Sequence, residues 1–210
     1  MTQPVLKSRY EEVCADQTSD IWEHLPTFVD AVAELDATTV VELGVRYGVS
    51  TIAWLHALDL LSEQDEERHR HLWSVDCSFP VAAPGTDVNL LDTQGPLGVQ
   101  RGWTFILGYD HWHEVLDALP DRDIDVLFID TNHVYEETLV ELELYLPRMS
   151  PGGRIFLHDT AVEVTGNAVT PQPPFPVRTA MQEFCDDRDL RYENNPNCFG
   201  LGTIFVEGTR

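Results

Sequence analysis

Short apolar segments alternate with amphipathic ones along most of the chain. Six-residue runs rich in branched side chains at 38–43, 71–76, 103–108, 125–130 and 154–159 indicate buried strands. Apolar positions recur at helical spacing in 19–35, 49–64, 110–119 and 177–187, and Tyr135, Leu139, Leu142 and Leu146 form one apolar helix face. The last two runs, 190–195 and 201–208, suggest a hairpin. This order predicts an α/β fold: a Rossmann-like seven-stranded sheet, mostly parallel with a C-terminal antiparallel hairpin, and helices on both faces.

The 210 residues suit one domain, which we expect to comprise an N-terminal helical segment (1–37) and a Rossmann-like core (38–210). The motif SPGG (150–153) predicts a turn before the fifth strand. Two long loops, around 78–100 and 160–177, are candidate walls for a substrate site. The N-terminal segment is a candidate for covering a cofactor or for contacting a neighbour in a homo-oligomer.

The net charge of the chain argues against two classes of binding partner. A formal charge of −23 repels phosphates and anionic lipid, so we expect neither nucleic acid nor membrane surfaces as partners. The four cysteines form no C-x-x-C pair, and no run approaches the roughly 20 apolar residues of a membrane span. We therefore expect a cytoplasmic protein with reduced thiols.

The first strand runs into a glycine-containing loop and then a helix. The motif is Glu42-x-Gly44-x-x-x-Gly48, with Ser50 and Thr51 in the first helical turn. Glycines let a ligand approach the backbone, and a helix N-terminus favours a carboxylate or phosphate. Neither the G-x-G-x-x-G of dinucleotide sites nor a Walker G-K-[ST] is present. An ordinary strand-to-helix turn is the alternative interpretation.

This loop resembles the E/D-x-G-x-x-x-G loop of class I S-adenosylmethionine-dependent methyltransferases. The resemblance implies that the acid ending the second strand, Asp76, holds the cofactor's ribose, and that the segment Leu107–Trp112 contacts the adenine ring. Asp110 also suits a helix cap. The implied cofactor residues are Glu42, Gly44, Val45, Arg46, Tyr47, Gly48, Ser50, Thr51, Asp76, Cys77, Gly108, Tyr109, Asp110 and Asp130.

The fourth and fifth strands end in Asp130, followed by His133, and in His158 and Asp159. The two aspartates are one strand–helix–strand unit apart, so adjacent parallel strands place both carboxylates within reach of one ion. A divalent cation would remove the cost of burying them together. Alternatively, His133 caps a helix, and His158 bonds to backbone.

The same residues resemble the metal-dependent O-methyltransferases that modify sugar hydroxyls on macrolides and aminocoumarins; together with the loop, the resemblance covers about residues 39–159. It implies metal ligands at Asp130, His158 and Asp159, and a general base at His133 acting with Asp130. His158 departs from the pattern, since an acid is expected there. Histidine ligates Mn²⁺, Fe²⁺ or Zn²⁺ better than Mg²⁺, so the metal differs, His158 supports other groups, or no metal binds.

The sequence therefore predicts an S-adenosylmethionine-dependent methyltransferase acting on a hydroxyl of a small molecule or glycan, assisted by a divalent metal (Mg²⁺ or Mn²⁺) and His133. The rivals are a metal-free methyltransferase or another enzyme on the same scaffold, and a non-catalytic S-adenosylmethionine-binding protein. The identity of the acceptor is not encoded in any motif.

Overall fold

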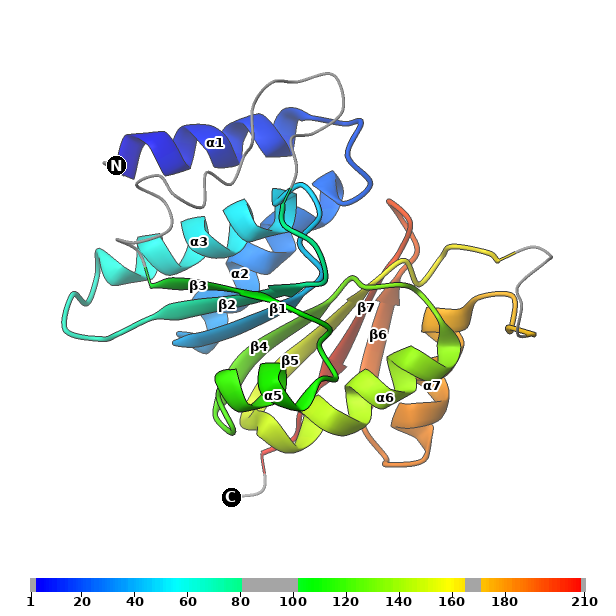
Figure 1. The fold of residues 1–210 in the computed structure, drawn as a ribbon. Coiled ribbons are helices and arrows are strands. Elements are labelled where there is room, and N and C mark those ends of the chain that lie inside the picture. Colours follow the sequence, from blue (N-terminus) through cyan, green and yellow to red (C-terminus); the bar gives the residue numbers. More distant parts are fainter. Residues whose placement is uncertain (1–2, 81–101, 165–170, 209–210) are drawn as a thin grey trace.

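A computed structural model of the protein describes residues 3–80, 102–164 and 171–208. Strands and helices alternate through these residues (Figure 1). In chain order they are α1 (Gln3–Ala15), η1 (Trp22–His24), α2 (Leu25–Leu35), β1 (Thr39–Leu43), α3 (Val49–Ser62), β2 (His71–Asp76), β3 (Trp103–Leu107), α5 (His113–Ala118), β4 (Ile124–Ile129), α6 (Tyr135–Tyr145), η2 (Leu146–Arg148), β5 (Met149–His158), α7 (Pro176–Asp186), β6 (Arg191–Asn195) and β7 (Leu201–Phe205). Among the described helices, none has both the length and the apolar character that crossing a bilayer requires.

The strands form one seven-stranded sheet in the order β3-β2-β1-β4-β5-β7-β6. Strands β1 to β5 are parallel, and β7 runs antiparallel to both β5 and β6. The predicted Rossmann-like sheet with a C-terminal hairpin is confirmed. The strand order reverses around β1, which lies between β2 and β4, and a sheet of this type binds ligands beyond the carboxyl ends of the strands at that point.

Helices cover both faces of the sheet. Figure 1 shows α1, α2 and α3 on one face and α5, α6 and α7 on the other. The α3 face is filled by stacked rings, with 4.3 Å between the centroids of Phe28 and Trp54 and 5.0 Å between those of Phe28 and Phe128. Along β4, Phe128 packs on this face and Leu127 on the other, as the period-two alternation of a strand requires.

Two predictions of local structure were wrong. Residues 19–35 form η1 and α2 instead of one helix. The preceding helix, α1, has no strong apolar pattern, since its buried apolar residues Leu6 and Val13 are seven positions apart. Residues 150–153 belong to β5 and not to a turn. They form a bulge, because the register with β4 passes from the pair Ile124–Met149 directly to Val126–Arg154, and backbone hydrogen bonds join Gly152 and Gly153 to Val206.

Candidate active site

The loop between β1 and α3 approaches the end of β4 very closely. Gly44 has a φ of +90°, and a Cβ built on it would lie 2.0 Å from the carbonyl oxygen of Asp130. Any side chain at position 44 would collide with that backbone, so only glycine fits. Gly44 is therefore required by a close contact with the backbone at the carboxyl end of the neighbouring strand, β4.

Asp76, at the end of β2, holds the same loop from the other side. Its Oδ2 accepts hydrogen bonds from the N–H groups of Val45 (2.9 Å) and Arg46 (3.0 Å), and its Oδ1 accepts one from Ser78 N–H (2.8 Å). Burial alone would raise the pKa of Asp76, but these donors bring it below its ordinary value. The ionised carboxylate of Asp76 thus holds the loop between β1 and α3 in place, and it also faces the first of the two clefts described below.

Glu42 lies beneath the loop and is completely buried. Its carboxyl accepts hydrogen bonds from the hydroxyls of Ser50 (2.6 Å), Thr51 (2.7 Å) and Ser74 (2.6 Å). Burial raises the pKa of Glu42 to about 7, although the three hydroxyl donors oppose the rise. This carboxyl ties β1, β2 and the start of α3 together.

Two adjoining clefts open above the carboxyl ends of the strands. The first, of about 320 Å³, is lined by nine of the predicted cofactor residues, which are Gly44, Val45, Arg46, Asp76, Cys77, Gly108, Tyr109, Asp110 and Asp130. The second, of about 470 Å³, lies between the loop and residues 16–21 and includes Tyr47 and Ser50. The structure therefore brings eleven of the fourteen predicted cofactor residues to the two clefts.

Three predicted cofactor residues line neither cleft. Glu42 and Thr51 are fully buried, so the expectation that they touch the cofactor is corrected to a supporting role under the loop. Gly48 has a φ of +80° and precedes the first residue of α3. Asp110 does not cap α5, because the residue at that position is Trp112.

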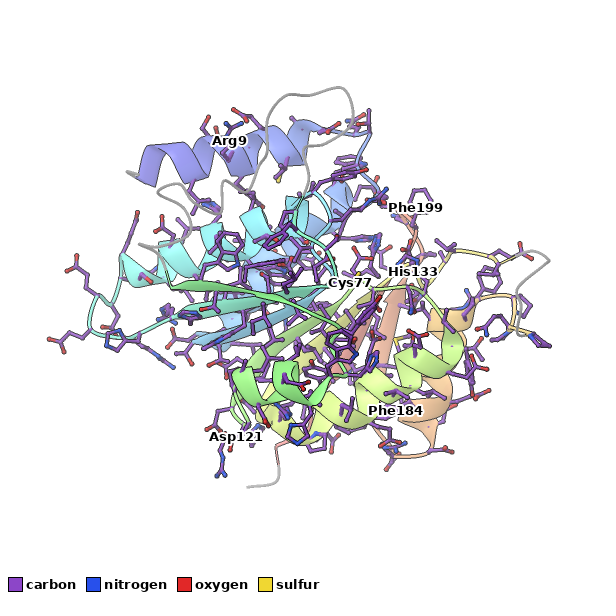
Figure 2. The ribbon with its side chains drawn as sticks, viewed as in Figure 1. Arg9, Cys77, Asp121, His133, Phe184 and Phe199 are labelled. Carbon is purple, nitrogen blue, oxygen red and sulfur yellow. The ribbon has the colours of Figure 1, made fainter. Side chains whose placement is uncertain are left out.

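Four charged groups meet where β4 and β5 end. His133 Nε2 lies 2.8 Å from Asp159 Oδ2 and 3.3 Å from Asp130 Oδ1. His158 Nδ1 lies 3.4 Å and 3.5 Å from the same two oxygens. His133 and Asp159 both have a φ of +58°, a left-handed conformation that turns their side chains back toward the strand ends. Figure 2 shows His133 at this edge of the sheet.

The charges in this cluster compensate one another. Burial would raise the pKa values of Asp130 and Asp159, but hydrogen bonds from the two histidines hold both below their ordinary values. Burial would likewise lower the pKa of His133, whereas the carboxylates raise it to about 9. At neutral pH His133 is therefore an imidazolium, and it can accept a proton only after losing its own.

His158 has acceptors on both sides of its ring. Its Nε2 contacts the carbonyl oxygens of Asp20 (3.1 Å) and Cys198 (3.3 Å), and its Nδ1 faces the two carboxylates. Burial would lower its pKa, but Asp130 and Asp159 raise it to about 11. Both ring nitrogens then carry protons, as they do in the His133 imidazolium, so either ring must lose a proton before it can bind a cation.

The group of side chains able to hold a cation differs from the predicted one. Ligand atoms of Asp130, His133 and Asp159 all lie within 4.8 Å of one another. Among the described residues this set contains His133 in place of the predicted His158, whose Nδ1 lies 3.4 Å and 3.5 Å from the two carboxylate oxygens. Two carboxylates and one imidazole suit Mn²⁺, Fe²⁺ or Zn²⁺ better than Mg²⁺.

The structure also reveals a residue that the sequence analysis missed. Glu141 is 4% exposed and lines the first cleft, although it lies on α6. The signal was present in the spacing, because Glu141 falls among the buried positions Thr138, Leu142 and Tyr145 on one helix face.

Several polar groups near the clefts contact protein groups or solvent. His111 and His113 are solvent-exposed. The amide of Asn132 donates to Glu137. Segments 81–101 and 165–170, which contain most of the first predicted substrate wall and about a third of the second, lie outside the described residues.

Comparison with known proteins is consistent with this geometry. Residues 41–160 match the family model described as a methyltransferase domain. A 56-residue stretch is 34% identical to protein y4gI of Sinorhizobium fredii; it covers 27% of this chain but only 6% of that protein.

Solved structures share the fold at low identity. A methyltransferase of Podospora anserina, PaMTH1, solved with S-adenosylhomocysteine, is similar over 96% of this chain and 87% of its own, with 14% identity and a TM-score of 0.64. An O-methyltransferase of Bacillus cereus, also in complex with S-adenosylhomocysteine, is similar over 95% and 91%, with 14% identity and a TM-score of 0.61. The O-methyltransferase NovP is similar over 90% and 79%, with 18% identity and a TM-score of 0.55.

Proposed function

This chain belongs to the methyltransferase-domain family and has the class I S-adenosylmethionine-dependent fold, and from that premise we propose that it methylates a hydroxyl oxygen of a small molecule or sugar. The observation that carries this proposal is the cluster of Asp130, His133 and Asp159 beside the cofactor cleft. The printed descriptions of two of the similar structures, as O-methyltransferases, agree with oxygen as the acceptor atom.

Methyl transfer to oxygen makes two demands on the protein. The acceptor oxygen must lie in line with the sulfonium methyl group, and its proton must be removed. The loop Gly44–Arg46 and Asp76 position the cofactor at the strand ends, and Asp130 lines both clefts, where the two reactants meet. His133 is the nearest titratable group able to take the acceptor's proton, once its own has been lost.

In a metal-dependent enzyme, the carboxylates of Asp130 and Asp159 would hold a divalent cation, and His133, whose ring nitrogen lies within 4.8 Å of both, would stay uncoordinated and serve as the base. When bound, such an ion would lower the pKa of a hydroxyl that coordinates it. The positive charge would also offset the carboxylates that now hold the proton on His133, and so would favour the neutral imidazole that a base requires. His158 orients the two carboxylates through its Nδ1. Its Nε2–H donates to the backbone carbonyls of Asp20 and Cys198, which fixes the ring.

A metal-free methyltransferase is the second candidate, and one observation favours it. The two histidines already offset the charges of Asp130 and Asp159, so the cluster has no uncompensated charge to attract a cation. In that case His133 loses its proton to solvent, and the rate depends on the fraction of neutral imidazole.

Calorimetry and mass spectrometry test the proposal in sequence. Titration with S-adenosylhomocysteine should show binding, and absence of binding would overturn the assignment. An acceptor screen by mass spectrometry should detect a methyl gain on polyhydroxylated compounds. Chelation followed by Mn²⁺ add-back then separates the candidates, since a metal-free enzyme keeps its full rate in the chelator.

His133 is tested by substitution. His133→Ala should lower kcat about 10²- to 10⁴-fold, and added imidazole should restore part of the rate. The exposed His113, which is replaced in the control variant His113→Ala, should tolerate the change. Full turnover by His133→Ala would disprove the assignment of the base.

A further inference from the structure

The turn between β6 and β7 carries a phenylalanine that is both exposed and conformationally strained. Phe199 has a φ of +65° and is 56% exposed. The left-handed conformation costs free energy for a bulky residue, and a side chain that stays more than half exposed regains little of that cost through burial. The preceding residue, Cys198, is also left-handed, with a φ of +45°. Such conformations persist only where surrounding contacts enforce them.

Contacts on both sides of Phe199 hold the turn in this conformation. The carbonyl oxygen of Phe199 accepts a hydrogen bond from the N–H of Ala161 at 2.8 Å. Gly200 has a φ of +94°, and a Cβ built on it would lie 2.4 Å from the nitrogen of Ala161, so this position admits only glycine. The thiol of Cys198 donates to the carbonyl oxygen of Asp20 at 3.0 Å. The neighbours of Phe199 therefore impose its position, and its own ring does not.

The turn lies directly beside the charged cluster. Leu201 pairs in register with His158, the last residue of β5, so Phe199 extends past the carboxyl end of that strand. The carbonyl oxygen of Cys198 lies 3.3 Å from Nε2 of His158. Figure 2 shows Phe199 and His133 at the same edge of the sheet. The residue that precedes Phe199 thus contacts the histidine that orients the two carboxylates of the cluster.

Phe199 and the cofactor residues lie on opposite sides of this cluster. The predicted cofactor residues lie at the ends of β1, β2, β3 and β4, whereas Phe199 immediately precedes β7. In the sheet, β5 separates those four strands from β7. Methyl transfer requires the acceptor oxygen to lie opposite the sulfur of the cofactor, in line with the methyl group. An acceptor at the cluster therefore approaches from the side on which Phe199 is held.

We propose that Phe199 is a specificity-determining residue of the acceptor site, and that its ring stacks on the apolar face of a six-membered ring that bears the hydroxyl to be methylated. This inference rests on the proposed function and narrows its acceptor from any hydroxyl compound to a pyranose or a phenol. Both have a flat apolar face on which an aromatic side chain can pack. An open-chain polyol has the hydroxyls but no such face. Because the turn is already fixed, Phe199 loses little conformational freedom when the acceptor binds.

Fluorine NMR detects this contact without turnover. The nine phenylalanines are replaced by 4-fluorophenylalanine, and the signal of Phe199 is the one that is missing from Phe199→Tyr. Catechol, methyl glucopyranoside and the open-chain sorbitol are titrated separately, each with S-adenosylhomocysteine present. The Phe199 signal should shift with at least one of the two ring compounds, and the compound that shifts it identifies the class of acceptor. No shift with either ring compound, or an equal shift with sorbitol, would overturn the inference.

Three substitutions at this position separate stacking from packing. In calorimetry, Phe199→Tyr should bind the active ring compound with wild-type affinity, and Phe199→Leu should bind it about three- to tenfold more weakly. Phe199→Asn should unfold at an equal or higher urea concentration than the wild type, because asparagine adopts the left-handed conformation more readily. Leu60→Ala, which shortens an exposed apolar side chain of α3, should leave binding unchanged. Unfolding of Phe199→Asn at a lower urea concentration would assign Phe199 to packing and overturn the inference.

Methylation assays keep this inference separate from the proposed function. If a ring compound shifts the Phe199 signal but no compound in the acceptor screen gains a methyl group, the proposed function fails and the ring-binding role of Phe199 stands. If the wild type and Phe199→Leu methylate an acceptor with the same kcat/KM, the inference fails and the proposed function stands.

Discussion

Replacing Glu42 with glutamine should make the protein more stable at neutral and alkaline pH. The carboxyl is fully buried among three hydroxyl groups, and its pKa is raised to about 7. The folded state therefore holds a proton that the unfolded state releases near the ordinary value of 4.5. Glutamine has nearly the same shape and never ionises, and the hydroxyls of Ser50, Thr51 and Ser74 can rotate to accept from its amide.

The size and sign follow from proton linkage. Since the folded pKa lies above the unfolded one, the contribution of Glu42 to stability is complete below pH 4.5 and is lost as pH rises through 7. A rise from 4.5 to about 7, at about 1.4 kcal/mol per pH unit, corresponds to about 3 kcal/mol. Most of this change falls between pH 5 and pH 8.

Urea unfolding of both proteins at several pH values in this range measures the effect. The free energy of unfolding of Glu42→Gln minus that of the wild type should increase by about 2 to 3 kcal/mol from pH 5 to pH 8. Glu114→Gln, an exposed glutamate, should show no such increase. A difference that stayed constant with pH, or decreased as pH rose, would refute the reasoning about Glu42.

Four further predictions concern the clefts and the charged cluster. His158→Ala leaves the buried Asp159 and the partly exposed Asp130 without their rear partner, so it should lower the free energy of unfolding by about 3 to 5 kcal/mol, measured by urea denaturation. Gly44→Ala should abolish S-adenosylhomocysteine binding in calorimetry, because its Cβ collides with Asp130; measurable wild-type affinity would contradict this. Asp76→Asn should weaken that binding about 10- to 100-fold, since the loop loses charged hydrogen bonds, while circular dichroism stays unchanged. Without a metal, the methylation rate should rise with pH up to about 9, where His133 becomes neutral, and a rate independent of pH would argue against His133 as base.

Three strand ends could be predicted from the sequence because the apolar runs of β2, β4 and β5 end in polar residues. Parallel strands place their carboxyl ends at one edge, so Asp76, Asp130 and Asp159 had to come together. The orientation of individual side chains could not be predicted in the same way. His133 and Asp159 adopt left-handed backbone conformations, which place both at the centre of the cluster and leave His158 behind it.

Contacts that depend on strand register were also beyond the sequence. Glu42 pairs in register with Ser74, and this pairing converts an apparent ligand-binding acid into a buried carboxyl surrounded by hydroxyls. The orientation of the His158 ring has a similar origin, since its Nε2 contacts backbone carbonyls of residues 20 and 198, which lie far away in the chain. Residue types alone do not reveal such partners.

The contact between Gly44 and the carbonyl of Asp130 has a consequence for how this enzyme can evolve or be engineered. The loop Gly44–Arg46 and the strand end that bears Asp130 touch with no room for a methyl group. Neither can shift by a fraction of an ångström without moving the other. A substitution at this contact would therefore alter cofactor binding and the charged cluster together. A change in acceptor preference would have to come from segments that do not include this contact.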